Sequence, residues 1–566
     1  MRKFFRIVLR VIGVLLLIII ILCIWFQFAT RVKTPVEKDM SITKVEITNP
    51  ESGFYKCGRN WLQQRDSGLW ELYLEGKPFD RGVIEGKLTK PLIEKQEQAF
   101  IDEINQIIPS PSYLKFLKCF IYWFNRNLSD YIPEEYKSEI YGISLSASDK
   151  FTAIGNNYQR ILNYHSAHDI GHALQDFKMV GCTSFGVWKD KSKTGDLLIG
   201  RNFDFYAGDE FDINKIVCFE KPENGYPFMM ITWGGMTGAV SGMNEQGLTV
   251  TINAAKSDIP YSARTPISIL TREILQYAKN IKEAYNIAQK RETFVSESIL
   301  IGSANDGKAV IIEKSPYKIA LVEPNDNYIV STNHFRSSTF SNDPRNKKDI
   351  RENASVYRYK KVMQDITEEE SIDVYGVAKI LRDQTGLNHS DIGMGNEKAI
   401  NQLIAHHSII FEPEKHLVWV SNGPWQIGEY TCYDILKIFH NFAALNNKTE
   451  ISEISKAIPS DCFLTSENYL RFNRYRELRK VMRNMIRSSK LTDIKSSYIR
   501  DFIGTNPEFF EVYSLSGDYF YFRNKPDSAA KYYRIALGKI IPRQNEKQQI
   551  INRLADCIIK MKKEKL

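Results

Sequence analysis

The chain has 566 residues, with 43% hydrophobic residues, 25% charged residues and a net charge of +9. This length exceeds one ordinary domain, and the composition excludes wholesale disorder, so we expect two or more folded units. Eight scattered cysteines without a Cys-x-x-Cys pair exclude a metal ribbon and a dense disulfide scaffold.

An uncharged apolar run extends from Val11 to Ala29, after four basic residues at the N-terminus. As a helix, this run is long enough to cross the roughly 30 Å hydrocarbon core of a bilayer. The basic residues before it outnumber Arg31 and Lys33 after it, so the positive-inside rule predicts a cytoplasmic N-terminus and an extracytoplasmic body. A cleaved signal peptide is the alternative, but no small-residue cleavage site follows the run. We therefore predict that residues 1–30 form a single-pass membrane anchor.

The segment after the anchor is predicted as a polar tether, residues 31–69. Residues 70–88 begin with alternating apolar residues and then turn at Gly76-Lys77-Pro78, which predicts a strand followed by a helix. Apolar residues at helical spacing in 96–124 and 134–174 predict a mainly helical region before the next change of period.

Short β-rich segments separated by Gly, Asn, Asp and Pro run from residue 180 to residue 332. One segment with helical periodicity, 265–291, interrupts them, and a late hairpin is predicted within 408–421. Strands and helices in this order predict an α+β protein in which helices cover stacked sheets.

Residues 426–566 are predicted as a basic helical region. From residue 465 onward, Lys and Arg are twice as numerous as Asp and Glu. Small and aromatic residues between Tyr513 and Ala536 have the spacing of one tetratricopeptide-like hairpin. A basic surface of this kind is either an ordinary solvated face or a contact for an acidic membrane surface or partner. Nucleic acid is not expected as a partner, because the body is predicted to be extracytoplasmic.

Cys182 lies in Val-Gly-Cys-Thr-Ser-Phe, where the helical region gives way to strands. A cysteine thiolate is a good acyl acceptor, but it needs a base and an oxyanion site. Residues that could serve follow it in the chain: Arg201, Asp204, Asn253, Asn333 and Arg358. Each has an ordinary alternative, because a cysteine can be a core residue, Arg and Asp can form a structural ion pair, and Asn commonly ends strands.

Several motifs together resemble the N-terminal-nucleophile cysteine hydrolases, particularly the acyl-coenzyme A:6-aminopenicillanic acid acyltransferase (isopenicillin-N acyltransferase) family. Bile-salt hydrolases and acid ceramidase are more distant relatives of the same type. The resemblance rests on Leu74 to Gly82, Gly181-Cys182-Thr183-Ser184, Gly200 to Asp204, Gly242 to Leu248, Ile409 to Pro413 and Trp419 to Ser421. It covers residues 70–425 and implies a four-layer αββα hydrolase domain, flanked by the N-terminal transmembrane helix and a C-terminal helical appendage.

The resemblance implies that the chain cuts itself between Gly181 and Cys182. Cys182 would then be the nucleophile, and its new α-amine, with a reference pKa of about 7.7–8.0, would be the general base. By the same resemblance, Arg201 and Asp204 would flank the nucleophile, and Arg201 would favour its thiolate. Asn253 would supply an oxyanion-hole amide, Asn333 would orient the amine, and Arg358 would hold the charged network. No cofactor or metal is implied.

The expected reaction is hydrolysis or acyl transfer at a carbon–nitrogen amide bond, through a thioester at Cys182. The expected substrate is an acylated amine: an N-acyl amino acid, a peptide-like amide or a lipid amide. One alternative is a non-catalytic, membrane-anchored envelope scaffold that binds a partner through its C-terminal helices.

A second alternative is a metal hydrolase that uses His165, His168 and His172, which share one face of a predicted helix. We expect a structural or surface role for these three histidines. Three other histidines, His334, His406 and His407, are candidates to line a pocket but have no recognisable partner in the sequence.

Overall fold

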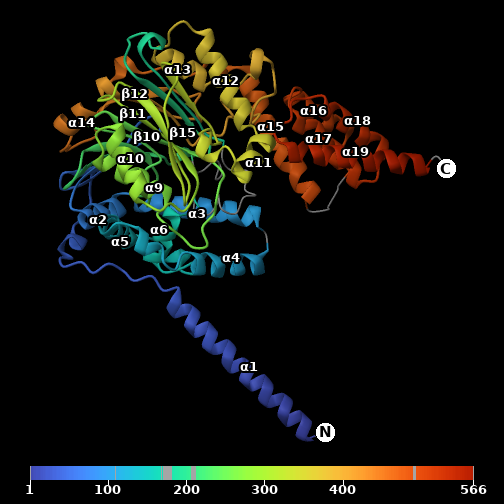
Figure 1. Cartoon of the computed structure of the whole chain (residues 1–566), viewed down its shortest axis with the longest axis horizontal. Helices are drawn as coiled ribbons and strands as arrows, with labels where there is room; N and C mark the ends of the chain where they lie inside the picture. The colour runs from blue at the N-terminus through green and yellow to red at the C-terminus, as the bar shows by residue number, and fades with distance from the viewer. Residues whose placement is uncertain are drawn as a thin grey trace.

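The computed structural model describes residues 2–108, 110–166, 169, 181–205, 212–487 and 493–564. Within these residues the chain forms two β-sheets with helices packed around them, a group of C-terminal helices and one projecting N-terminal helix (Figure 1). The predicted α+β class is confirmed.

The larger sheet contains eleven strands in the order β1-β2-β3-β4-β7-β8-β9-β10-β11-β12-β13. These strands are Thr48–Glu51, Phe54–Cys57, Asn60–Gln64, Trp70–Gly76, Ile216–Pro222, Phe228–Thr232, Ser241–Asn244, Leu248–Ala254, Glu297–Ser303, Lys308–Lys314 and Ile319–Val322. Strands β4 and β7 pair in parallel, with Trp70 opposite Ile216 and Gly76 opposite Pro222. This parallel pair joins the N-terminal strands to the rest of the sheet.

The smaller sheet contains six strands in the order β14-β5-β6-β15-β16-β17. These strands are Tyr328–Ser331, Thr183–Val187, Leu198–Phe203, His407–Glu412, Leu417–Ser421 and Tyr430–Asp434. Strand β5 begins immediately after Cys182 and pairs with β14 on one side and with β6 on the other. Position 182 therefore lies at the start of an inner strand.

Helices pack against both sheets. Helix α2 (Pro78–Leu88) contacts β2 to β4, α9 (Ile267–Tyr277) contacts β9 and β10, and α10 (Ile281–Lys290) contacts β11 and β12. Helix α12 (Ser355–Glu368) contacts β14 and β5 of the smaller sheet, and α13 (Val374–Leu381) contacts β6 and β15. Strand β5 also contacts β10, β11 and β12, so the two sheets pack against each other.

Alternating side chains of single strands enter different apolar clusters. On β11, Ile299 and Ile301 join a cluster shared with α9 and α10, whereas Leu300 points into a cluster formed by residues of both sheets. On β6, Ile199 joins the cluster between the sheets, and Leu198 joins one shared with α12 and α13. This two-residue period is expected for strands that are covered on both faces.

The structure differs from the sequence prediction at several element boundaries. Residues 48–64, within the predicted tether, form β1 to β3, and β17 with α14 (Ile435–Asn441) extends the body beyond residue 425. The helical segment predicted at 265–291 is divided into α9 and α10. These differences arise because edge strands and short helices are stabilised by tertiary pairing more than by local periodicity.

The first helix, α1, projects from the body and is not buried in a protein core. Helix α1 (Arg2–Ala29) contains, within Lys3–Ala29, an 18-residue window with a mean hydropathy of 3.4 and no buried residue, so it is long and apolar enough to cross a membrane. Besides α2, four further α-helices precede the first strand of the smaller sheet among the residues described: α3, α4, α5 and α6, which are Lys90–Ile107, Pro111–Phe124, Glu134–Ser144 and Asn157–His165.

The C-terminal helices α15 to α19 pack on one another around a separate apolar cluster. Their bounds are Glu467–Arg487, Ser496–Thr505, Phe510–Phe522, Pro526–Leu537 and Gln544–Glu564. In α17, Gly517 lies against the ring of Tyr533 in α18, where an added Cβ would approach the ring carbon Cε1 to 2.5 Å. This close approach explains the small residue at 517 and holds α17 and α18 together, as expected for a helical hairpin.

Candidate active site

Cys182 is a buried residue with a 1% exposed fraction, beside three of the charged side chains that the sequence picks out. The charges of Arg201, Asp204 and Arg358 all act on its thiol. The structure therefore brings the candidate nucleophile and its predicted charged partners into one place.

Burial controls the protonation of the Cys182 thiol. Desolvation raises its pKa to about 12, although the positive charges of Arg201 and Arg358 act in the opposite direction. The Arg201 charge therefore favours the Cys182 thiolate, as expected. In the intact chain, however, desolvation raises the pKa of the thiol by more than this charge lowers it. At neutral pH the thiol keeps its proton and needs a nearby base to react.

Arg201 is held inside the body of the protein by neutral groups. It points from β6 toward the larger sheet, where it donates to the carbonyl oxygens of Val240 (2.9 Å) and Ile252 (2.5 Å) and to the Ser241 hydroxyl. Its guanidinium also lies 4.3 Å from the centre of the Phe203 ring. Desolvation lowers the pKa of Arg201 to about 10, so it remains a cation at neutral pH.

Asp204 follows β6 and is completely buried. Its Oδ2 accepts a hydrogen bond from Gln402 Nε2 (3.1 Å), whereas Oδ1 has no hydrogen-bond partner among the residues described. Desolvation raises the pKa of Asp204 to about 7, and the positive charges of Arg358 and Arg201 limit that rise. One carboxylate oxygen thus remains available for a further donor.

Gln402 is the functional candidate that sequence analysis missed. Its Nε2 donates to the carbonyl oxygen of Gly181 (2.7 Å) as well as to Asp204, so one amide group contacts both the peptide bond before Cys182 and the buried carboxyl group. A Cβ at position 181 would come within 2.6 Å of Gln402 Nε2, so a larger residue there would displace the Gln402 amide from this contact. Gln402 lies in a loop more than two hundred residues away in the chain, and no local pattern identifies it.

The remaining predicted residues form a connected group around the same point. Arg358 donates to Asn333 Oδ1, and Asn333 Nδ2 donates to the carbonyl oxygen of Ala254 (3.0 Å). Asn253 accepts from the Ser184 hydroxyl (2.9 Å) and donates to the Ser331 carbonyl oxygen. Asn253 therefore links strands of both sheets beside Cys182, and its Nδ2 is engaged with backbone in the intact chain.

His407 also has partners that the sequence does not reveal. Its Nε2 lies 2.8 Å from the Ser241 hydroxyl and 3.4 Å from Arg201 Nη1, and its Nδ1 lies 2.8 Å from Nδ1 of His406. Burial lowers the pKa of both histidines well below the usual value, so they are neutral. The two histidines therefore pack beside Arg201 and help to hold it in position. His334 instead contacts Ser355, at 2.8 Å from its Nδ1.

The predicted histidine helix gives no support for a metal at His165. Both ring nitrogens of His165 are engaged, Nδ1 with the carbonyl oxygen of Ile161 (2.9 Å) and Nε2 with the backbone N–H of Thr237 (2.9 Å). Burial lowers its pKa to about 4. His168 and His172 lie outside the described residues. His165 thus has the structural role that we expected.

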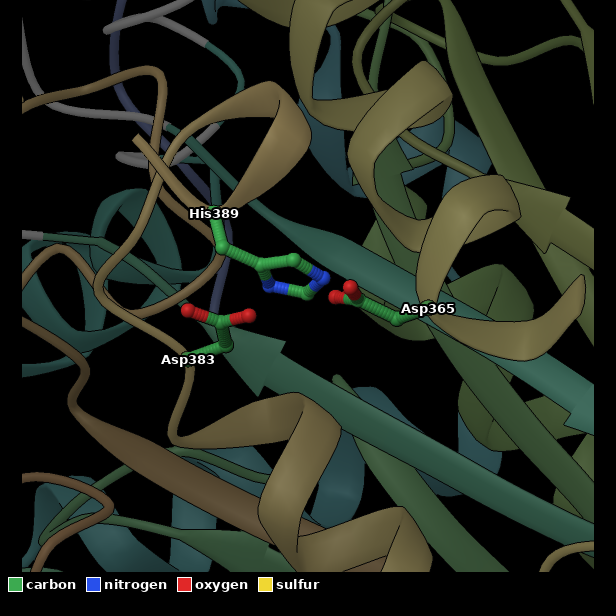
Figure 2. A group of neighbouring side chains, drawn as sticks. All are labelled: Asp365, Asp383 and His389. Atoms are coloured by element: carbon green, nitrogen blue, oxygen red, sulfur yellow. The ribbon is translucent and has the colours of Figure 1, made fainter. Parts of the chain in front are cut away.

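Figure 2 shows a different group that could hold a metal ion, formed by Asp365, Asp383 and His389. The ammonium of Lys361 lies 2.5 Å from Asp365 and 2.7 Å from Asp383, and Asp383 also accepts from Thr385. His389 pairs with Glu368 at 2.8 Å. Because Lys361 already supplies the positive charge between the two carboxylates, we interpret this group as an ion-pair network.

An apolar pocket lies beside Asp204. Phe205, the residue after Asp204, contributes to its wall, and so does Val240, whose carbonyl oxygen binds Arg201. The other lining residues come from α3, α6 and the segment after β8: Ile93, Gln96, Glu97, Phe100, Ile161, Tyr164, Trp233, Gly234, Gly235 and Met236. This pocket offers a mainly apolar surface next to the charged group.

Comparison with known families gives one match. Residues 188–423 match the model of the family described as acyl-coenzyme A:6-aminopenicillanic acid acyl-transferase. The matched part begins after Cys182 and contains the other predicted residues: Arg201, Asp204, Asn253, Asn333 and Arg358. The resemblance drawn from the sequence motifs is confirmed by this match.

Two curated proteins are similar to parts of the chain. An uncharacterized protein of Archaeoglobus fulgidus is 22% identical over 322 residues, which are 50% of this chain and 52% of that protein. Protein dcd1B of Dictyostelium discoideum is 23% identical over 263 residues, 43% of this chain and 50% of that protein. The chain thus spans about half the length of the curated relatives it matches.

Two solved structures align with less than half of the chain. An N-acylethanolamine-hydrolyzing acid amidase ortholog from Caenorhabditis elegans is 16% identical and covers 41% of this chain and 93% of its own, with a TM-score of 0.31. A mutant of conjugated bile acid hydrolase from Clostridium perfringens is 14% identical and covers 45% and 93%, also with a TM-score of 0.31. Such low scores carry no argument about this chain.

Proposed function

We propose, from the match of residues 188–423 to the acyl-transferase family, that this chain is an amide hydrolase or acyltransferase with Cys182 as its nucleophile. The proposal includes cleavage of the chain between Gly181 and Cys182, which produces the N-terminal nucleophile. The observation that carries it is the double contact of Gln402 with the Gly181 carbonyl oxygen and Asp204.

In the first step, the sulfur of Cys182 attacks the carbonyl carbon of Gly181, and the thiol proton passes to the amide nitrogen of Cys182. The carbon–nitrogen bond breaks, the nitrogen of Cys182 leaves as an amine, and an ester through sulfur joins the two residues. Water then hydrolyses this ester, which leaves a carboxylate on Gly181 and restores the thiol. The Gln402 N–H donor stabilises the negative charge that develops on the Gly181 oxygen, as oxyanion donors do.

In turnover, the freed amine of Cys182 accepts the thiol proton, and the sulfur attacks the acyl carbon of an amide substrate. The substrate's carbon–nitrogen bond breaks, its amine leaves with the proton, and the acyl group stays on Cys182 as a thioester. Water releases it in hydrolysis, and a second amine takes it in acyl transfer. Oδ1 of Asp204, which has no partner in the described part of the chain, is available to accept a hydrogen bond from the new amine.

The other side chains have positioning roles in this proposal. Arg201 and Arg358 place positive charge near the sulfur, which favours the thiolate once the base is present. Asn333 links Arg358 to the backbone at Ala254 and orients the new amine. Asn253 supplies an oxyanion donor after its contact with the Ser331 carbonyl is exchanged for the substrate.

The substrate class in this proposal is an acylated amine with an apolar acyl part. The apolar pocket supports this choice, because it is lined by Phe205, which follows Asp204, and by Val240, whose carbonyl oxygen binds Arg201. Burial of apolar surface in such a pocket favours binding by roughly 25 cal/mol per Å². An N-acyl amino acid, a peptide-like amide and a lipid amide all fit this description.

The proposal also covers architecture and location. We assign the two packed sheets and their outer helices to the four-layer αββα sandwich of the N-terminal-nucleophile type. We assign α1 as an uncleaved anchor with the body on the extracytoplasmic side, because basic residues precede the apolar run.

Mass spectrometry and N-terminal sequencing of the purified full-length protein test the proposal directly. We expect two fragments, the second beginning Cys-Thr-Ser-Phe, and labelling of that fragment by a thiol-reactive acyl probe. Cys182→Ala should remain one chain and should not be labelled. Cys218→Ala removes another buried cysteine and serves as the control, since it should be cut and labelled as the parent is.

The scaffold alternative predicts the opposite result. Under that alternative the purified parent protein remains a single chain, and the acyl probe labels it no more than it labels Cys182→Ala. This outcome would reject the enzyme proposal.

A further inference from the structure

Helix α4 (Pro111–Phe124) is strongly apolar and yet has no buried residue. Its sequence, PSYLKFLKCFIYWF, contains aromatic or aliphatic side chains in every turn. In a water-soluble body such a helix normally covers a core. The absence of a buried side chain on α4 therefore indicates a surface that something apolar covers.

The exposed aromatic residues of α4 lie on one face. Tyr113, Phe116 and Phe120 follow helical spacing and are 52%, 64% and 42% exposed. On the opposite face Lys118 Nζ donates to the Ala153 carbonyl oxygen, and at the end of the helix the Phe124 ring lies 5.1 Å from that of Phe294. The helix is thus fixed in place with its aromatic face outward.

The last turns of α4 and α1 are in contact. Trp123 of α4 lies 5.3 Å from Trp25 of α1 and 6.2 Å from Phe26, measured between ring centres. Figure 1 shows α1 leaving the body beside α4, on the same face of the molecule. A bilayer crossed by α1 must end near the last turn of α1, so its surface reaches α4.

We propose that α4 lies in the interfacial layer of the bilayer that α1 crosses, with its aromatic face among the lipids. The helix has 14 residues and is about 21 Å long, too short to span the hydrocarbon core, so it lies along the surface. Tyr and Trp are the residues typical of this layer. Lys115 on α4 is exposed and places positive charge at the level of the lipid headgroups, as interfacial helices do.

This second contact would fix the orientation of the body on the membrane. A single helix joined through residues 30–40 leaves the body free to tilt, whereas a helix about 21 Å long on the bilayer removes that freedom. The proposal rests on α1 as a membrane span and does not depend on the chemistry at Cys182.

A spin label at Cys119 tests the position of α4. Cys119 is exposed on α4, and Cys23 and Cys462 are the other exposed cysteines among the described residues. The full-length protein would carry Cys23→Ala, Cys462→Ala and Cys182→Ala, so that only Cys119 reacts, and would be placed in lipid nanodiscs. Accessibility of the label to oxygen and to a water-soluble nickel complex is then measured by electron paramagnetic resonance.

We expect the label at Cys119 to be several-fold more accessible to oxygen than to nickel, as is typical of lipid exposure. A protein that keeps only Cys462 for labelling is the matched reference and should show aqueous accessibility. A label at Cys119 that behaves as the Cys462 label does, or that is shielded from both reagents, would overturn the proposal.

A second variant checks the role of the aromatic face. Phe116→Glu with Phe120→Glu, in the Cys119-labelled protein, should shift the label to aqueous accessibility without changing the thermal midpoint, since neither ring is buried. Tyr317→Glu is the control, because Tyr317 is 60% exposed elsewhere on the body and should leave the label unchanged. Unaltered lipid accessibility in the double variant would also count against the proposal.

Discussion

Two groups of buried charges in this protein are organised in opposite ways. Arg81, Arg272, Glu139 and Glu220 are at most 1% exposed, and each arginine contacts both glutamates, with the Arg81 distances at 2.5 and 2.8 Å. Around Cys182, by contrast, Arg201, Asp204 and Arg358 form no ion pair within 4 Å among the residues described; their hydrogen bonds go to amides, carbonyls and a hydroxyl.

The difference separates a structural group from a reactive one. In the Arg81–Glu139–Arg272–Glu220 group, opposite charges compensate each other in the folded state, and the group ties α2, α5, β7 and α9 together. Near Cys182 the charged side chains hydrogen-bond to neutral groups. Their charges can therefore interact with the negative charge that develops on the sulfur during a reaction. Charged groups that are held by neutral partners in this way are typical of functional sites.

The largest expected effect is the loss of reaction in Cys182→Ala. If the charges around Cys182 serve chemistry, this variant should lower acyl turnover by about 10⁴-fold or more, as for other essential nucleophiles. Turnover of amide substrates by Cys182→Ala and by the Cys218→Ala control provides the measurement. Equal activity in the two variants would show that Cys182 is not the nucleophile, and the charges around it would then have no catalytic role.

Removal of one arginine from each group should affect stability unequally. Arg272→Met leaves Glu139 and Glu220 with less compensation and should lower the free energy of unfolding by about 3–5 kcal/mol. Arg201→Met leaves neutral acceptors and should cost about 1–3 kcal/mol. Urea unfolding of both variants in the uncut Cys182→Ala background measures this difference. A larger loss for Arg201→Met than for Arg272→Met would contradict the comparison.

The Gln402 side chain should affect the rate of chain cleavage more than stability. Gln402→Leu removes the donor to the Gly181 carbonyl oxygen and should slow cleavage by about 10²-fold, the effect of one oxyanion donor. Gln426→Leu is a matched control, because Gln426 is also buried and its amide atoms lack hydrogen-bond partners within the described ranges. The appearance of the fragment that begins at Cys182, followed by gel electrophoresis, measures both rates. Equal rates would exclude a role for Gln402.

The last expected effect is a pH dependence of stability caused by Asp204. Its pKa in the folded chain is raised to about 7 from 3.8, so the unfolded chain releases this proton at lower pH. The contribution of Asp204 to stability is therefore complete below pH 4 and is lost as the pH rises toward 7. Asp204→Asn, in the Cys182→Ala background, should become more stable relative to its parent between pH 4 and pH 8.

Denaturant unfolding at these two pH values measures the change. A difference between Asp204→Asn and its parent that is the same at both pH values would show that Asp204 is not a buried, titrating group.

The sequence predicted the strands around the candidate site well because their residues carry a strong local signal. The segments that became β5, β6, β10, β11 and β12 are short stretches rich in β-branched and apolar residues between turn residues, and this pattern needs no knowledge of distant contacts. Strands β1 to β3 are short and polar in part, and they form because they pair with β4. Local periodicity could not reveal them.

The same distinction applies to the site. Cys182, Arg201 and Asp204 could be found because they stand in short motifs beside strong strands. Gln402 could not, because its contact with Gly181 joins residues from distant parts of the chain. The raised pKa of the Cys182 thiol could not be predicted from the sequence either, because it results from the burial of Cys182 in the folded structure.

The parallel pairing of β4 with β7 has a consequence for the proposed cut before Cys182. Strand β4 would belong to the first fragment and β7 to the second, yet seven residues of one align with seven of the other within a single sheet. Severing the backbone would therefore leave the two polypeptides interwoven. The piece that carries the nucleophile would stay attached, without a covalent bond, to the piece that carries α1.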